Sequence, residues 1–246
     1  MNIHAQEPLA VATVEAIRNG DLEALKRLLS ENPSLATARI CDTGNTHDAS
    51  GVSRTLLHVA TDWPGHFPKG AATVATLIAS GAGVNAQCTG SHAETPLHWA
   101  ASSDDVAVLD ALLDAGADME APGAVIGGGT PLADAVAFGQ WQAARRLVER
   151  GARTTLWQAA ALGLLDRVEE HFARDAPAPD ELTNAFWCAC HGGQRQCAEY
   201  LLRRGADVNW VGYDGLTPLD AARRGGSPEF VDWLRTLGAK AAEDLD

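Results

Sequence analysis

The chain has 246 residues, of which 46% are apolar, and its formal net charge is −13. This length can bury a sizeable core as one large domain, two small domains or a repeat array. So acidic a chain repels the phosphates of nucleic acid, and its basic clusters are short pairs, so no nucleic-acid partner is expected. No long apolar run and no basic leader region occur, so the sequence predicts neither a membrane span nor a secretion signal, and a cytoplasmic location is the default expectation.

The chain is expected to form pairs of short amphipathic helices joined by turns. The first pair is predicted within residues 8–37, where "VEAIRNGDLEALKRLLSENPSLA" places apolar residues at helical spacing. Later stretches repeat one plan: a Thr-Pro-Leu-His-like start, small residues, a polar turn, a Leu-Leu pair and a Gly-Ala-Asp-like end. Further pairs are therefore predicted at residues 54–87, 94–121, 129–153, 154–180, 183–210 and 216–240. One pair alone buries too little apolar surface, so neighbouring pairs must share a core.

The stretch from Glu94 shows why this plan gives two helices. Pro96 suits the first helical turn, where a backbone N–H would have no partner, and Thr95 before it can cap the helix. The pair Leu112 and Leu113 supplies an apolar stripe to the second helix. Gly116 can end that helix in the left-handed conformation, which glycine adopts at little cost.

Two insertions interrupt the regular spacing. Residues 38–53 separate the first two pairs, and residues 63–70 (WPGHFPKG) stop the helix that begins near His58. The interval from Thr130 to Thr154 is short instead, so the connecting hairpin is expected to be missing there. Insertions on one side of a repeat array usually belong to its binding face, so the functional surface is predicted on the first four pairs.

The segments Thr95 to His98 (TPLH) and Gly205 to Asn209 (GADVN) closely resemble the ankyrin repeat. The resemblance covers nearly the whole chain. It implies an all-α solenoid of about seven helix-turn-helix units with short β-hairpin fingers, forming a single domain over residues 1–246 as a stand-alone, bacterial-type array. It also implies that the array holds a partner protein in its concave groove, and that His58 and His98 are structural, with imidazoles bonded to neighbouring loops.

The expected groove is lined by the residue after the histidine position of each unit and by the residue four places later. The middle of this series is aromatic, and the second insertion places further side chains beside it, while the first insertion approaches from the finger side. The predicted binding groove contains Trp63, Trp99, Phe138, Asp134, Asp62, His66, Phe67, Ser103, His92, Asp42 and His47.

Several conspicuous side chains also have structural interpretations. Trp99 could pack as a core-edge aromatic on Trp63, and Trp157 and Trp187 take the place of the structural histidine and are expected to pack. Trp233 is expected to close the C-terminal end, and His171 to be solvated on an outer helix. For His191, which borders the groove, both a structural and a binding role stay open.

The five cysteines predict neither disulfides nor a metal centre. Their odd number, in a chain without an export signal, indicates reduced thiols. The motif from Cys188 to His191 (CACH) lacks the second, well-spaced pair of ligands of a zinc site. The glycine-rich stretch at residues 121–129 lacks the Lys-Ser or Lys-Thr ending of a phosphate loop. No metal and no cofactor are therefore expected.

Two functions fit these patterns. The first is a protein-binding module, acting as an inhibitor, an immunity protein or a regulatory protein, whose partner has a basic or mixed surface because the chain is acidic. The alternative is a small-molecule-binding protein or an enzyme with a groove pocket lined by Trp63, Trp99, Asp134 and Phe138. In that case Asp134 and His66 would be the acid–base groups, because a carboxyl beside tryptophans has a raised pKa. The absence of any nucleophile–base sequence motif favours the binding module over an enzyme.

Overall fold

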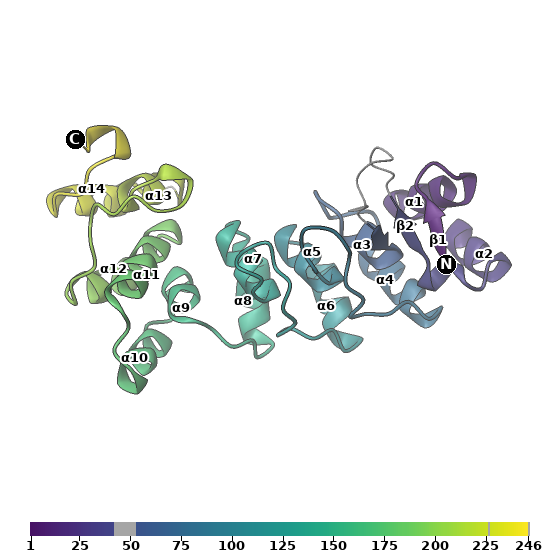
Figure 1. Cartoon of the computed structure of the whole chain (residues 1–246), viewed down its shortest axis with the longest axis horizontal. Coiled ribbons are helices and arrows are strands. Elements are labelled where there is room, and N and C mark those ends of the chain that lie inside the picture. The colour runs from purple at the N-terminus through teal and green to yellow at the C-terminus, as the bar shows by residue number, and fades with distance from the viewer. Residues whose placement is uncertain (42–52, 226, 246) are drawn as a thin grey trace. The chain divides into compact units, whose positions relative to one another are not determined.

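The computed structural model describes residues 1–41, 53–225 and 227–245 (Figure 1). Two predicted groove residues, Asp42 and His47, lie outside these ranges. The described chain forms two compact units, Met1–Ala152 and Arg153–Asp246, and each is considered by itself. The expected division into the seven repeat ranges given above, within one domain, stays a prediction.

The first unit consists of four helix pairs in two rows. The helices are α1 (Pro8–Asn19), α2 (Leu22–Glu31), α3 (Leu56–Thr61), α4 (Gly70–Ala79), α5 (Pro96–Ser102), α6 (Val106–Asp114), α7 (Pro131–Ala137) and α8 (Trp141–Glu149). A short 3₁₀ turn, Leu35–Thr37, follows α2. The inner helices α1, α3, α5 and α7 contact each other in chain order, and so do the outer helices α2, α4, α6 and α8 (Figure 1). This arrangement confirms the predicted helical repeat solenoid.

The starts of the inner helices α3 and α5 carry the capping that the sequence predicts. At α3, the Thr55 N–H donates to Nδ1 of His58 at 3.3 Å, and the His58 Nε2–H donates to the Glu94 carbonyl at 3.0 Å. His98 repeats the pattern one helix pair later, with its Nε2 atom 3.4 Å from the Gly129 carbonyl. Burial lowers the pKa of both imidazoles to about 4, so both stay neutral. The predicted structural role of these histidines is confirmed.

A small sheet accompanies the first insertion. Strand β1 (Asn2–His4) lies parallel to β2 (Arg39–Cys41), and β2 pairs antiparallel with β3 (Ser53–Thr55). Ile3 and Ile40 are partners in this register and are both buried, so the sheet adds to the core. The antiparallel pair is the expected kind of short finger, whereas the N-terminal strand was not predicted.

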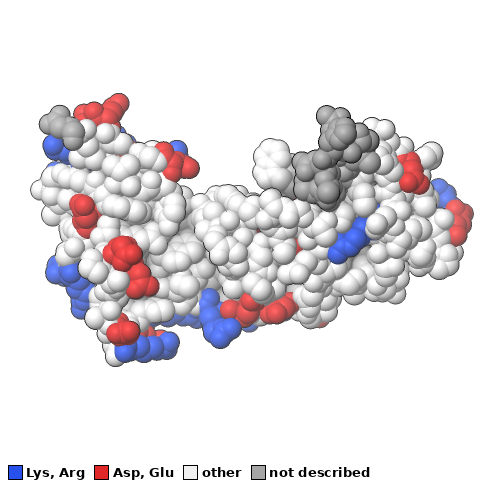
Figure 2. Space-filling model, viewed as in Figure 1, with Lys and Arg blue, Asp and Glu red and all other residues white. Residues whose placement is uncertain are grey.

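Ion pairs join the outer helices α6 and α8. Asp110 accepts from Arg146 Nε and from a terminal nitrogen of Arg150, both at 2.8 Å, and Arg150 also reaches Asp114 at 2.7 Å. These guanidinium contacts lower the pKa of the Asp110 carboxyl. In Figure 2, several charged side chains of the first unit lie along its lower edge and others lie on the face and at the N-terminal end, while large parts of the face are uncharged.

Replacing Asp110 by asparagine is expected to lower the urea midpoint of the first unit at low salt, because Asn keeps the acceptor oxygen but loses the charge. At 1 M NaCl the Debye length is about 3 Å, so the difference between variant and wild type should shrink. Urea titrations at both salt concentrations check this. A difference that is unchanged by salt would mean that the side chain acts through packing or neutral hydrogen bonding.

The second unit is built from three further helix pairs. Its helices are α9 (Leu156–Leu162), α10 (Leu165–Arg174), α11 (Pro179–His191), α12 (Arg195–Leu202), α13 (Pro218–Gly225) and α14 (Pro228–Thr236), with 3₁₀ turns at Tyr213–Gly215 and Ala242–Asp244. The inner helix α11 contacts both α9 and α13. Phe186 on α11 is fully buried at the centre of the shared core.

The aromatic and histidine predictions for the second unit have mixed outcomes. Trp187 is buried and its indole N–H donates to the Leu216 carbonyl at 2.9 Å, and Trp157 packs against the same core, as expected. Trp233 stacks on Phe230 in the last helix. The prediction for His171 was wrong: its ring is half-buried and donates from Nε2 to the Thr154 carbonyl at 3.0 Å.

Candidate functional site

The segment between α3 and α4 carries four of the predicted groove residues. Asp62 ends α3 and forms ion pairs with Arg18 on α1 at 3.0 Å and with Arg54 at 3.7 Å. The next residue, Trp63, is 77% exposed. Phe67 is half-buried farther along the segment. The indole of Trp63 is therefore presented to solvent directly beside a charged anchor.

The second anchor of this segment is His66. Its backbone N–H donates to the Asp105 carboxylate at 2.7 Å, and its Nε2–H donates to the Ser103 carbonyl at 3.1 Å. Gly65 makes this approach possible, because a Cβ there would come within 2.7 Å of the Ser103 Cβ. The segment is thus held at Asp62 and at His66, on either side of Trp63. The His66 ring, predicted as an acid–base group in the alternative function, bonds to the turn between α5 and α6.

Asp105 was not predicted to contribute, yet it connects two neighbouring helix pairs of the first unit. It is buried, and its Oδ1 caps α6 by accepting the Val108 N–H at 3.2 Å, while Oδ2 takes the His66 N–H. Ser103, predicted as a groove residue, is itself buried and donates to the Thr61 carbonyl at 3.4 Å. The position of Asp105 directly before an apolar helical stretch is an N-cap signal that could have identified it.

Trp99 and Asp134 belong to a second group, in which Glu94 is the centre. The Trp99 indole donates a hydrogen bond to the Glu94 carboxylate, and its ring packs edge-on against His58, with centroids 5.0 Å apart. Asp134 on α7 is fully buried, and its carboxyl is hydrogen-bonded to that of Glu94. Glu94 was missed because it was taken only as the first residue of a repeat, and no local pattern marks its partner 40 positions later in the sequence.

The remaining predicted site residues lie apart from both groups. Phe138 ends α7 and is 47% exposed, and His92 is exposed in the loop before α5. Trp63, Ser103 and Phe138 follow or end three successive inner helices that contact one another in order. The C-terminal ends of α3, α5 and α7 therefore form the surface on which the exposed aromatics of the first unit, Trp63 and Phe138, occur.

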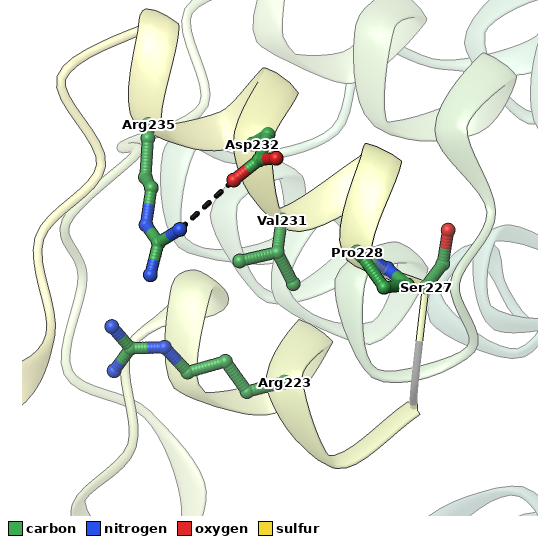
Figure 3. A pocket seen from close by; sticks show the side chains of 6 residues that line it. All are labelled: Arg223, Ser227, Pro228, Val231, Asp232 and Arg235. Atoms are coloured by element: carbon green, nitrogen blue, oxygen red, sulfur yellow. Dashed lines mark hydrogen bonds and ion pairs between the residues drawn. The ribbon is translucent and has the colours of Figure 1, made fainter.

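A shallow hollow of about 220 Å³ lies between α13 and α14 of the second unit (Figure 3). It is lined by Arg223, Ser227, Pro228, Val231, Asp232 and Arg235. Both guanidiniums are already engaged, since Arg235 pairs with Asp232 at 2.9 Å and Arg223 with Asp220 at 3.0 Å. The hollow therefore offers little uncompensated charge to an anionic ligand.

The described part of the chain contains neither a cluster of metal-binding side chains nor a membrane-spanning helix. Within it, no group of three or more His, Cys, Asp or Glu side chains is arranged to hold a metal ion. All five cysteines are free thiols, and burial raises the pKa of Cys188 to about 12 and that of Cys197 to about 11. His191, next to these thiols in sequence, stacks on Trp187 with centroids 5.5 Å apart. No helix of the described ranges is both long and apolar enough to cross a membrane.

Short helix pairs, stacked in chain order and several of them begun by a Thr-Pro-Leu-His-like start, define a helical repeat protein. A family model described as ankyrin repeats matches residues 13–122, 69–156 and 156–243. The chain belongs to the ankyrin-repeat family. Ankyrin repeats are protein-interaction modules, so this class of function follows for the fold.

Two similar proteins agree with this assignment. An ankyrin repeat and KH domain-containing protein of Caenorhabditis briggsae is 32% identical over an alignment of 185 residues, which covers 71% of this chain. The chain spans only 7% of that relative's length. The crystal structure of the human ASB11 ankyrin repeat domain matches with a TM-score of 0.51 at 20% identity, covering 93% of this chain and 98% of that one. At this identity the structural match shows the fold.

Proposed function

We propose that the first unit holds a partner protein on the surface formed by the C-terminal ends of α3, α5 and α7, with Trp63 as the main contact. The observation that carries the proposal is the 77% exposure of the Trp63 side chain. An indole left in water is unfavourable, and large aromatic side chains of this kind concentrate the binding energy of protein interfaces.

The anchoring of residues 62–69 supports this role. Asp62 is held by two arginines, and His66 is held by Asp105 and Ser103, so the backbone on both sides of Trp63 is fixed before binding. A fixed aromatic loses less conformational entropy on association than one on a free loop. The anchored segment is thus suited to present the ring to a complementary pocket.

The partner is proposed to have a basic or mixed surface, because the net charge of −13 attracts such surfaces and repels acidic ones. Inhibition, immunity or regulation would each follow from holding such a protein. The free thiols support a reducing, cytoplasmic setting for the interaction. The geometry favours protein binding over a small-molecule pocket, because Asp134 is fully buried while Trp63 projects into solvent, so the two do not line one accessible cavity.

Replacing Trp63 by alanine is expected to weaken partner binding roughly 30-fold, which corresponds to about 2 kcal/mol, the loss typical of an interface hot spot. The thermal stability should change little, since most of the ring is already in water. The measurement starts with immobilised wild type and variant in native cell lysate, followed by titration of the purified captured protein.

Two further variants make the experiment specific. Arg224→Ala removes an exposed side chain of the second unit, paired with Asp214, and should bind like wild type. Trp99→Ala should mainly lower stability, because that ring packs on His58 and bonds to Glu94. Equal affinities of wild type and Trp63→Ala for the captured protein would show that the site lies elsewhere.

A further inference from the structure

The glycine-rich loop before α7 covers the buried carboxyl of Asp134, beside the half-buried carboxyl of Glu94. Within the loop, the Gly123 N–H donates to the Gly128 carbonyl and the Ala124 N–H to the Gly129 carbonyl, both at 3.0 Å. Gly123 is packed against the loop before α5, because a Cβ at position 123 would overlap the Ala93 carbonyl. Ala124 is buried and the neighbouring Val125 is 41% exposed. The loop is therefore a closed flap with one face on Ala93 and Glu94 and the other in water.

The flap is fastened to Asp134 by one carboxyl oxygen. The Ile126 N–H donates to Oδ1 of Asp134 at 3.2 Å. The other oxygen, Oδ2, is buried and receives no hydrogen bond from any N–H or hydroxyl group of the described residues. The group that faces the Asp134 carboxyl is instead the carboxyl of Glu94. Two acceptor groups in contact require a proton between them, because two adjacent carboxylates would repel.

The surroundings offer this pair little compensation. Burial raises the pKa of Glu94, and the Trp99 indole N–H and the nearby His92 oppose this rise. The Glu94 charge in turn raises the pKa of Asp134 further. His98, whose Nε2 faces the Gly129 carbonyl at the base of the flap, is neutral because burial lowers its pKa to about 4. A proton shared by the two carboxyls therefore removes the repulsion between them.

We infer that the proton held between Glu94 and Asp134 is a latch that keeps the flap of residues 121–129 closed, and that losing this proton opens the flap. An ionised Asp134 is a stronger acceptor for the Ile126 N–H, but it is also a charge sealed from water against a second carboxylate. Opening the flap hydrates that charge. The glycines at 123, 127 and 128, which all have positive φ, give the loop the freedom to move.

The titration range supports a switch near neutral pH. Burial, followed by the Glu94 charge, raises the pKa of Asp134 from 3.8 to about 7, although the backbone N–H groups of Ile126 and Val125 act in the opposite direction. Burial also raises the pKa of Glu94. The closed flap therefore holds its proton at pH 6 and loses it at pH 8.

Hydrogen–deuterium exchange tests the latch on the intact chain, with rates corrected for intrinsic pH dependence. The protection of the Val125 and Ile126 amides should fall roughly tenfold from pH 6 to pH 8, the factor that linkage gives for a group with these closed and open pKa values. Asp134→Asn should abolish the fall, because its amide oxygen accepts from Ile126 while its NH₂ donates to Glu94, as the protonated acid does.

Further variants decide between the possible outcomes. Glu94→Gln should reduce the fall, since it removes the opposing charge. Asp104→Asn is the matched control: Asp104 also accepts a backbone N–H, that of Ala143 at 2.7 Å, and its variant should keep the wild-type fall. An equal fall in Asp134→Asn, or no fall in wild type, would overturn the latch. Recovery of flap protection at pH 8 on adding calcium or magnesium chloride would overturn it too, because a metal ion would then be the occupant.

Discussion

Alanine at position 192 is expected to destabilise the second unit by about 3 kcal/mol, the upper part of the usual range for overpacking a closed interior. Gly192 ends α11 where this helix passes closest to α9. A Cβ there would overlap the carbonyl oxygen and carbon of Ala161, a fully buried residue of α9. The obstacle is main chain, so it cannot be relieved by rotating a side chain, and two packed helices must separate instead.

The neighbouring glycine provides the control. Gly193 has a φ of +69°, and a Cβ there would meet nothing within 4 Å. Gly193→Ala should therefore cost only the strain of the left-handed conformation, roughly 1 kcal/mol. Urea unfolding followed by tryptophan fluorescence compares the two variants with wild type. Equal destabilisation would mean that the contact between Gly192 and Ala161 does not limit the approach of the helices.

The second large effect is expected in the pH dependence of stability. Because the pKa of Asp134 is 3.8 before folding and about 7 after it, this group favours folding fully below pH 3.8. Its contribution then declines by roughly 1.4 kcal/mol per pH unit and is lost above pH 7. Asp134→Asn cannot lose a proton, so at pH 8 it should be more stable than wild type by up to roughly 4 kcal/mol, an upper limit because a hydrated open flap relieves part of the strain.

The comparison must be made as a difference between variant and wild type. His58 and His98 titrate in the same range with the opposite sign: their pKa is lowered from 6.5 to about 4, so their contribution is present above pH 6.5 and is lost as the pH falls through about 4. Denaturant titrations from pH 4 to pH 8 on both proteins cancel the histidine contributions. A stability difference that stays constant over this range would contradict the burial of a protonated Asp134.

The helical repeat could be predicted from the sequence because its determinants are local. Thr95, Pro96 and His98 lie within one helical turn, and their capping role depends on their spacing alone. Strand β1 could not be predicted in the same way. The strand forms because Ile3 pairs with Ile40, which follows the first helix pair in the sequence. Three residues are too few to show a strand periodicity of their own. The hydrogen bond of His171 to the Thr154 carbonyl likewise depends on how α10 packs.

The candidate site was predictable only as a set of residue types. Reading positions along the inner helices placed Trp63, Trp99 and Asp134 on one groove, yet their exposure differs completely: Trp63 is in solvent, Trp99 is half-buried and Asp134 is sealed. The difference arises from the loops, because the flap covers Asp134 and the segment after α3 lifts Trp63 outward. Loop conformation depends on contacts far apart in sequence, such as those of Glu94 and Asp105, which helical periodicity does not encode.

The histidine bonds between successive helix pairs also bear on how this chain folds as it leaves the ribosome. His58 needs the Glu94 carbonyl and His98 needs the Gly129 carbonyl, so each ring is satisfied by backbone synthesised more than thirty residues later. Until that backbone emerges, a buried imidazole nitrogen would have no partner, which is costly in a closed core. The helix pairs that carry His58 and His98 should therefore become stable only after the next pair has been made. These helix pairs would then fold one repeat behind the stretch being synthesised, so that the first unit folds in order from its N-terminal side.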